Sequence, residues 1–142
     1  MEKAMKALMR IFLALHVFIY RLTGGKVMGK IGPGSVLLLT TIGRKSGETR
    51  TTPVTYFRDG ADYVIVASAG GGPKNPGWYY NLKANPHTNI QVMDKVISVN
   101  AQETNGTERE RLWKTLVSQY PQFNGYAQKA GRVIPLMLLH AR

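Results

Sequence analysis

The sequence predicts an α+β fold, a barrel of mostly antiparallel strands. Apolar runs rich in β-forming residues alternate with short turns, of which Asp59-Gly60 is a hairpin signal. Helix-forming runs stand at the amino terminus and late in the chain and do not alternate regularly with the strands, which argues against a doubly wound sheet. The chain has 142 residues, 44% of them hydrophobic, so one domain can bury a core without disulfides.

The first expected element is a helix over residues 3–22, which contain neither Gly nor Pro. Apolar residues cover most of its circumference, and four cations lie within about 60° of one another. These cations are Lys3, Lys6, Arg10 and Arg21. The longest uncharged run, Ile11–Tyr20, is too short to cross a bilayer, and no secretory cleavage site follows it.

Two interpretations of this helix stay open. It either packs on the domain with its cations in water, or it lies in a membrane interface with its cations on anionic lipids. The apolar arc is wider than one-sided packing requires, which favours the membrane. His16, inside the apolar run, is interpreted as a packed helix residue and not as a ligand.

A Gly-rich connection over Thr23–Gly34 leads into the barrel, so residues 1–30 are expected to form a helix with a linker and residues 31–142 the main domain. Pro53 implies an edge or a bulge in its strand. The expected strands are Val36–Ile42, Arg50–Arg58, Asp62–Ala69, Asn89–Met93, Val96–Glu103 and Arg132–Leu139.

Two helices are expected between these strands. One runs from about Asn75 to Ala84, with Asn75 as its N-cap and Pro76 in its first position. The other covers Thr107–Tyr120 and opens with the capping-box pattern Thr107-x-x-Glu110.

The charge balance predicts an anionic partner. Nineteen Lys and Arg against eight Asp and Glu give a net charge of +11. Such a surface attracts nucleic acid, an anionic membrane or a phosphorylated small molecule. The first thirty residues hold six cations and one acid, so 6 − 1 = +5 of the excess lies there.

The sequence lacks the residues that metal binding, nucleophilic catalysis and carboxylate-pair catalysis require. There is no Cys, and the three His are far apart in sequence, so no metal site is expected. No G-x-S-x-G motif and no paired carboxylates are evident. Anion binding combined with aromatic stacking remains.

Two segments carry that chemistry. In GRKSGETR, Arg44, Lys45 and Arg50 flank a turn that can direct cations and N–H groups at a phosphate, although a solvated surface turn has the same composition. In KNPGWYYNLKANP, the consecutive aromatics Trp78, Tyr79 and Tyr80 cannot all share one buried face, so at least one should project toward a ligand, a partner or a loop.

Together, LLLTTIGRKSGETRTTPVTYFRDG and VIVASAGGGPKNPGWYYNLKANP resemble the deazaflavin-dependent nitroreductases, also called coenzyme F-420-dependent quinone reductases. This family is the A branch of the flavin/deazaflavin oxidoreductase superfamily, and the resemblance covers roughly residues 30–140. It implies a split β-barrel like that of FMN-binding proteins, reduced coenzyme F-420 (an 8-hydroxy-5-deazaflavin) as hydride donor, and an actinobacterial source.

The resemblance also implies site residues. Ser68 and Tyr126 would be catalytic, and Thr55, Tyr120, Phe123 and Tyr126 would bind substrate. The family's nitroreductase carries tyrosines where this chain has Thr55 and Phe123. The implied cofactor-binding residues are Arg44, Lys45, Ser46, Arg50, Thr51, Thr52, Pro53, Val66, Ala67, Ser68, Ala69, Gly77, Trp78, Tyr79, Tyr80 and Asn81.

The expected reaction is hydride transfer from F-420 to quinones, activated enones or nitroaromatic compounds. The expected location is the cytoplasm, with peripheral contact on the inner face of the cell membrane. The alternatives are a split barrel that binds FMN or heme, and a basic nucleic-acid-binding module, although no nucleic-acid recognition motif is present. The oligomeric state is left open.

Overall fold

The computed structural model describes residues 2–27, 29–31 and 34–142. Six antiparallel strands form a closed split β-barrel in the order β2-β3-β4-β7-β6-β5, because β2 also pairs with β5. The short β1 adds to the outer edge of β2. The strands are β1 Lys30–Ile31, β2 Gly34–Ile42, β3 Thr49–Asp59, β4 Asp62–Val66, β5 His87–Val92, β6 Lys95–Glu103 and β7 Leu136–Ala141.

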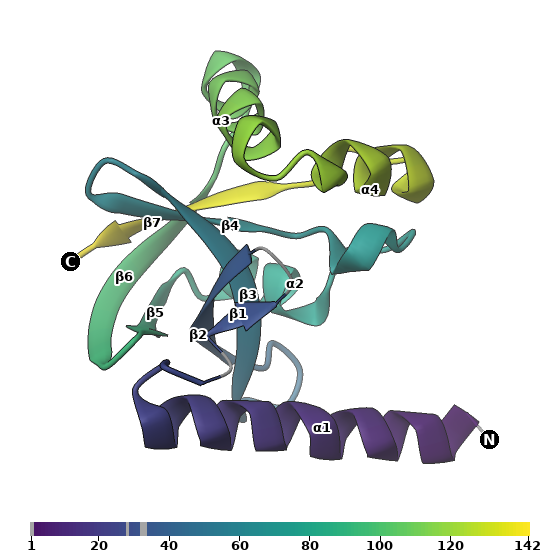
Figure 1. Cartoon of the computed structure of the whole chain (residues 1–142), viewed down its shortest axis with the longest axis vertical. Coiled ribbons are helices and arrows are strands. Elements are labelled where there is room, and N and C mark those ends of the chain that lie inside the picture. Colours follow the sequence, from purple (N-terminus) through teal and green to yellow (C-terminus); the bar gives the residue numbers. More distant parts are fainter. Residues whose placement is uncertain (1, 28, 32–33) are drawn as a thin grey trace.

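The helices stand at two ends of this barrel (Figure 1). Helix α1 lies across one end, and α3 and α4 cover the other, while α2 follows the 3-10 turn η1 beside the barrel. The bounds are α1 Glu2–Thr23, η1 Ala69–Gly71, α2 Gly77–Ala84, α3 Gly106–Gln119 and α4 Gln122–Ala130.

Two apolar clusters form the main core. One fills the barrel around Leu37, Ile65 and Leu139. The other lies between the outer barrel face and α3–α4, where Phe57 and Val64 pack with Leu112 and Phe123, among others. Burial of the alternate faces of β3 and β4 in these two clusters fixes the register of both strands.

Helix α1 contacts the barrel through its last turns. The Tyr20 hydroxyl donates toward the carbonyl oxygens of Val36 (3.1 Å) and Gln91 (3.3 Å) and accepts from the Met93 amide (2.8 Å). Tyr20 is fully buried, and burial raises its pKa. The turns before His16 are exposed and extend past the strands (Figure 1).

Most expected elements are present, with displaced ends. Pro53 pairs with Leu38 in the half of β3 that has no β4 neighbour, which confirms the local edge. The strand expected over Asp62–Ala69 ends at Val66, because η1 turns the chain away from the sheet. The strand expected from Arg132 starts only at Leu136, because Arg132 bonds to a loop instead.

The expected helix caps are wrong. Helix α2 begins at Gly77 with Pro76 as N-cap, since the Asn75 side chain is engaged by Arg132. Helix α3 begins at Gly106 with Asn105 as N-cap and no side-chain cap bond, so Thr107 and Glu110 form no capping box. Helix α4 was not among the expected elements.

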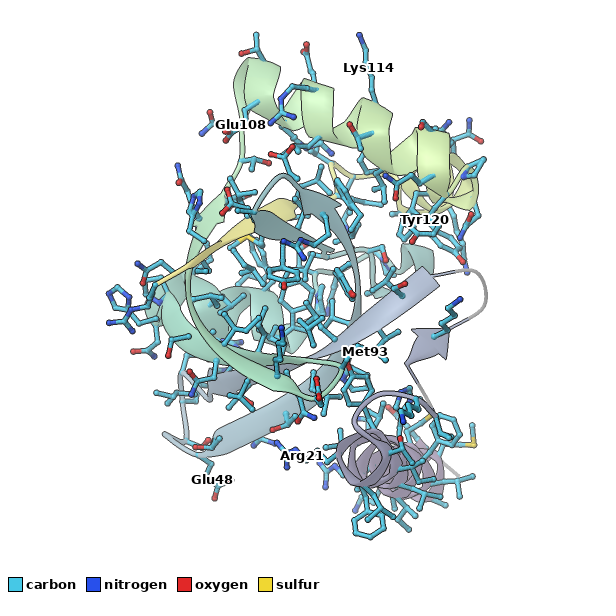
Figure 2. The ribbon with its side chains drawn as sticks, turned by 60° about the vertical axis from the view of Figure 1, so that its left-hand side comes forward. Arg21, Glu48, Met93, Glu108, Lys114 and Tyr120 are labelled. Carbon is cyan, nitrogen blue, oxygen red and sulfur yellow. The ribbon has the colours of Figure 1, made fainter. Side chains whose placement is uncertain are left out.

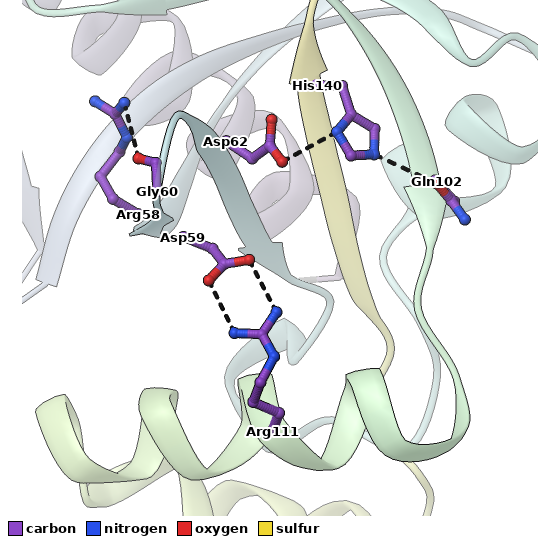
Figure 3. A network of polar contacts seen from close by, with 7 residues as sticks. All are labelled: Arg58, Asp59, Gly60, Asp62, Gln102, Arg111 and His140. Atoms are coloured by element: carbon purple, nitrogen blue, oxygen red, sulfur yellow. Dashed lines mark hydrogen bonds and ion pairs between the residues drawn. The ribbon is translucent and has the colours of Figure 1, made fainter.

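An ion pair fastens α3 to the β3–β4 hairpin (Figure 3). Both Arg111 Nη atoms bond the two Asp59 carboxylate oxygens, at 2.9 and 3.0 Å. Beside it, His140 bridges Asp62 (3.1 Å) and Gln102 (3.3 Å). The hydrogen bonds from Arg111 hold the pKa of Asp59 below its usual value.

This pair predicts an acid-sensitive contribution to stability. A carboxyl whose pKa is depressed by folding stabilises the fold above its unfolded pKa, about 4, and loses that effect as the pH falls through the folded pKa. Asp59→Asn should therefore be less stable than wild type at pH 7, and the two should converge below about pH 4. Urea denaturation from pH 3 to pH 7 measures this. Asp94→Asn, at an exposed turn residue, is the control, and an Asp59→Asn gap independent of pH contradicts the assignment.

Candidate functional site

A cavity of about 430 Å³ opens between the β2–β3 turn and the start of α2. It takes residues from three places in the chain: the end of β2 with its turn, the first half of β3, and the amino-terminal turn of α2. The lining residues are Thr41, Gly43, Arg44, Lys45, Ser46, Arg50, Thr52, Pro76, Gly77, Trp78 and Asn81.

The electrostatics of this cavity favour an anion. Arg44, Lys45 and Arg50 line it, and no carboxylate is among the described lining residues. The amino terminus of α2 adds unpaired N–H groups and the positive end of the helix dipole. A phosphate or a carboxylate is therefore the complementary ligand group.

Asn81 joins the two walls of the cavity. It is buried, and its Oδ1 accepts from the Arg44 backbone N–H (3.1 Å) and from Arg44 Nη1 (3.3 Å). Its Nδ2 donates to Thr41 Oγ1 (3.2 Å) on β2. One side chain of α2 thus holds the basic turn and the strand before it.

The turn itself is compact at Gly43. The Gly43 amide donates to the Glu48 carbonyl (2.7 Å) and its carbonyl accepts from the Gly47 amide (2.8 Å). A Cβ at position 43 would lie 2.6 Å from Ser46 Oγ and 3.4 Å from the Glu48 carbonyl oxygen, so a larger residue here would force the Ser46 hydroxyl to move. The closure keeps Arg44 and Lys45 at the cavity wall.

The three consecutive aromatics do not share one buried face, as their spacing predicts, although the rings of Tyr79 and Tyr80 touch edge to face with centroids 5.1 Å apart. Trp78 is buried and lines the cavity. The Tyr80 ring lies 5.0 Å from the Arg44 guanidinium, a cation–π contact that supports the basic wall from outside. Tyr79 points away, and its hydroxyl donates to Glu103 Oε1 (2.7 Å); burial and this carboxylate raise the pKa of Tyr79 to about 12.

A second group of expected residues gathers at η1. Ser68 precedes η1, and its hydroxyl does not cap that turn. Helix α4 packs closely against η1: a Cβ added at Gly71 would lie only 3.3 Å from the Tyr126 Cα. Tyr120, Phe123 and Tyr126 form a row of edge-to-face rings with centroids 6.3 and 5.2 Å apart. Phe123, in the middle, is buried in the core.

Half of the cofactor-binding residues expected from the sequence line the cavity: Arg44, Lys45, Ser46, Arg50, Thr52, Gly77, Trp78 and Asn81. Thr51, Pro53 and Thr55 lie along β3, and Val66–Ala69 lie at the end of β4 and the start of η1, outside the cavity lining. Thr51 Oγ1 instead accepts a hydrogen bond from Arg21 of α1 (3.2 Å).

Sequence reasoning missed four residues of this region. Thr41, Gly43 and Pro76 line the cavity, and Arg132 bonds the loop that leads to it. Gly43 and Pro76 belong to the two conspicuous segments, so their motifs contained a signal. Thr41 and Arg132 carry none, because their role arises from contacts across the fold.

Comparison with known proteins shows which family this chain is similar to. Residues 12–141 match a family described as F-420H(2)-dependent quinone reductase. An F-420H(2)-dependent quinone reductase of Mycobacterium tuberculosis is 42% identical over 134 residues, covering 92% of this chain and 90% of the relative.

Two solved structures are similar as well. A structure of an F-420-H2-dependent reductase, FDR-A, has a TM-score of 0.68 and 42% identity, covering 74% of this chain and 93% of that chain. A structure described as a domain-swapped dimer has a TM-score of 0.70 and 36% identity, covering 98% of both chains.

The Asn81 junction gives a direct prediction for stability. Asn81→Ala leaves the Arg44 amide and the Thr41 hydroxyl without their partner, so the free energy of unfolding should fall by about 1–3 kcal/mol. Asn85→Ala, an exposed Asn after the same helix, is the matched control and should stay near wild type. Chemical denaturation of both variants measures this; equal midpoints would remove Asn81 as the junction.

Proposed function

This chain belongs to the F-420H(2)-dependent quinone reductase family, and we propose that it transfers a hydride from reduced coenzyme F-420 to a quinone. The observation that carries the proposal is the cation-lined cavity at the family's two most specific segments. Activated enones and nitroaromatic compounds share the electron-poor character of quinones and are the further acceptor classes we propose.

The cavity fits the anionic end of this cofactor. F-420, when bound, supplies the hydride-donating ring carbon. We propose that Arg44, Lys45 and Arg50 bind its phosphate and carboxylate groups, while Trp78 offers an apolar wall to its less polar part. Ser46 and Thr52 supply hydroxyl donors on the same lining.

The acceptor would lie toward η1. Reduction of a quinone to a hydroquinone adds one hydride and one proton, so negative charge develops on an acceptor oxygen before it is protonated. We propose that Ser68, whose hydroxyl does not cap η1, donates from its hydroxyl or its backbone N–H to that oxygen. Tyr126, on α4 against η1, would line this side and hold a proton at its hydroxyl.

We further propose that residues 1–30 attach the protein to an anionic membrane surface while residues 31–142 carry the reaction. No helix in the described ranges is long and apolar enough to cross a bilayer. Helix α1 nevertheless presents a broad row of apolar side chains, each more than half exposed. They are Met5, Leu8, Met9, Ile11, Phe12, Leu15, Phe18 and Leu22.

The arrangement of α1 fits attachment parallel to a surface. Figure 2 looks nearly along α1, with Arg21 on its barrel side. Ile11, Leu15, Phe18 and Leu22 lie about 180° around the helix from the buried Tyr20. The four cations Lys3, Lys6, Arg10 and Arg21 lie between the apolar face and the Tyr20 face. Apolar side chains can therefore enter the headgroup region while the cations contact lipid phosphates. A lipid-soluble quinone is then available at the same surface.

The cofactor proposal is tested with purified protein, F-420H2 and a short-chain soluble quinone. Oxidation of F-420H2, followed by the absorbance of the deazaflavin, should require both protein and quinone. Lys45→Ala should weaken F-420 binding by about 1–2 kcal/mol, roughly tenfold, because a charge-assisted contact is lost. Lys114→Ala, an exposed Lys on α3, is the matched control. Full affinity in Lys45→Ala and in Arg50→Ala would remove the anion site.

The membrane proposal is tested by co-sedimentation with two kinds of vesicle, one that contains anionic phosphatidylglycerol and one of neutral phosphatidylcholine alone. Binding should require the anionic lipid and weaken at high salt. Replacing Lys3, Lys6 and Arg10 by Gln should weaken it by roughly two orders of magnitude, at about 1 kcal/mol per cation near the surface. Replacing the exposed Lys95, Lys114 and Arg142 by Gln is the charge-matched control. Phe18→Glu should also abolish binding, and a wild-type protein that binds neither vesicle ends the proposal.

A further inference from the structure

Arg132 reaches from the segment between α4 and β7 into the loop between β4 and α2. Its Nε donates to the Gly72 carbonyl (3.1 Å), and Nη1 donates to Asn75 Oδ1. Its Nη2 donates to three carbonyl oxygens at 3.1–3.3 Å: those of Ala67, Ser68 and Lys74. All three guanidinium nitrogens therefore bond this one loop.

The charge of Arg132 is directed entirely at the loop. Within the described residues it forms no ion pair with a carboxylate, and it is half-buried. A guanidinium that donates to several backbone carbonyls makes charge-assisted hydrogen bonds in a fixed planar geometry. Lysine, with a single ammonium, cannot reproduce that geometry.

The loop needs such a hold, because its backbone is strained. Ala69, directly after Ser68, has a φ of +49°, in the left-handed region that a residue with a Cβ rarely adopts. Ala69 is the first residue of the turn η1, which is only three residues long. Strained backbone persists where surrounding contacts enforce it, and such sites are common in functional regions.

The bonds to Arg132 also decide where the loop's donors point. In a trans peptide the N–H points opposite to the C=O of the same unit. Because the carbonyls of Ala67 and Ser68 face Arg132, the N–H groups of Ser68 and Ala69 face away from it. Neither N–H has a hydrogen-bond partner within the described part of the chain.

The other end of the loop leads to the cavity. Lys74 and Asn75, both bonded by Arg132, directly precede Pro76 and Gly77 at the cavity-lining start of α2. The same guanidinium therefore holds the turn that carries Ser68 and the segment that opens the anion cavity.

We propose that Arg132 is a positioning residue of the reductase, which orients the N–H groups of Ser68 and Ala69 as a pair of donors to the acceptor oxygen. This inference rests on the proposed function, because the acceptor is a quinone. Arg132 acts through the loop and touches neither cofactor nor acceptor. Its removal should weaken a stabilisation that grows in the transition state and lower kcat more than it raises KM.

The experiment compares Arg132→Lys with Arg111→Lys, the same chemical change at the surface pair of α3. For each, kcat and KM for a short-chain quinone, the Kd of F-420 and the unfolding midpoint are measured below the midpoint temperature. Arg132→Lys should lower kcat at least tenfold and change the quinone KM less than threefold, while the F-420 Kd rises threefold to tenfold because the bond to Asn75 is lost as well. Arg111→Lys should keep kcat within twofold of wild type.

Amide hydrogen exchange provides a readout independent of turnover. In Arg132→Lys, the hydrogen-bonded amides of Ala67, Gly71 and Gly72 in this loop should exchange at least tenfold faster, while those of β2 and β3 stay unchanged. A loss of activity that only follows the unfolded fraction, or an unchanged kcat in the folded variant, overturns the proposal. So does unchanged exchange of these three loop amides.

Asn75→Ala distinguishes the bonds that Arg132 makes near Ser68 from those it makes near the start of α2. This variant can also be measured if the Arg132 variants do not fold. It removes the side-chain bond at the α2 end and leaves the bonds of Arg132 to the carbonyls of Ala67 and Ser68, so F-420 affinity should fall about threefold to tenfold while kcat stays within threefold. A larger loss in kcat than in affinity contradicts the division of roles. If wild type fails to oxidise F-420H2 with any quinone, the proposed function fails, and the hold on the loop is still judged by the exchange measurement.

Discussion

The Asn81 side chain is the contact on which the candidate site depends. It is buried between α2 and the end of β2, where its oxygen accepts two bonds from Arg44 and its nitrogen donates to Thr41. A buried amide is costly unless both its oxygen and its nitrogen are bonded, so its partners must stay in place. The positions of the basic turn and of the α2 amino terminus are thereby coupled, and the cavity between them keeps its cations on one wall.

Asn81 fastens α2 to β2 and to the turn after it, and Arg132 fastens the segment before α2 to the segment before β7. Both side chains bond the backbone of other segments, one at the β2–β3 turn and one at the loop after β4. The strained Ala69 and the tight Gly43 turn lie at these two points. Irregular backbone is thus fixed by polar side chains anchored in α2 and beside β7, which suits a site that must hold its donors in fixed directions.

Helix α1 and the anion cavity are connected through strand β3. Helix α1, which we propose meets the membrane, donates from Arg21 to Thr51 on β3, and Thr51 stands between the cavity-lining Arg50 and Thr52. Tyr20 fastens the same helix end to β2 and to the Met93 turn. Tyr20 and Arg21, two adjacent residues in the last turn of α1, therefore tie this helix to the strands that carry the anion cavity.

The fold class, the basic turn, the aromatic segment and the amphipathic character of α1 could be predicted from the sequence, because local composition and periodicity express these features directly. The family resemblance of the two segments implied that Arg44, Lys45, Trp78 and Asn81 belong to one cofactor site, and all four line the cavity. The sequence could not give the helix caps: Asn75 has cap chemistry, but its side chain bonds Arg132. Only the tertiary structure decided the roles of Thr41 and Arg132, which bond residues 40 and about 60 positions away in the chain. Contacts at such separation leave no periodic trace in a single sequence, because the barrel closure that brings them together is a property of the whole fold.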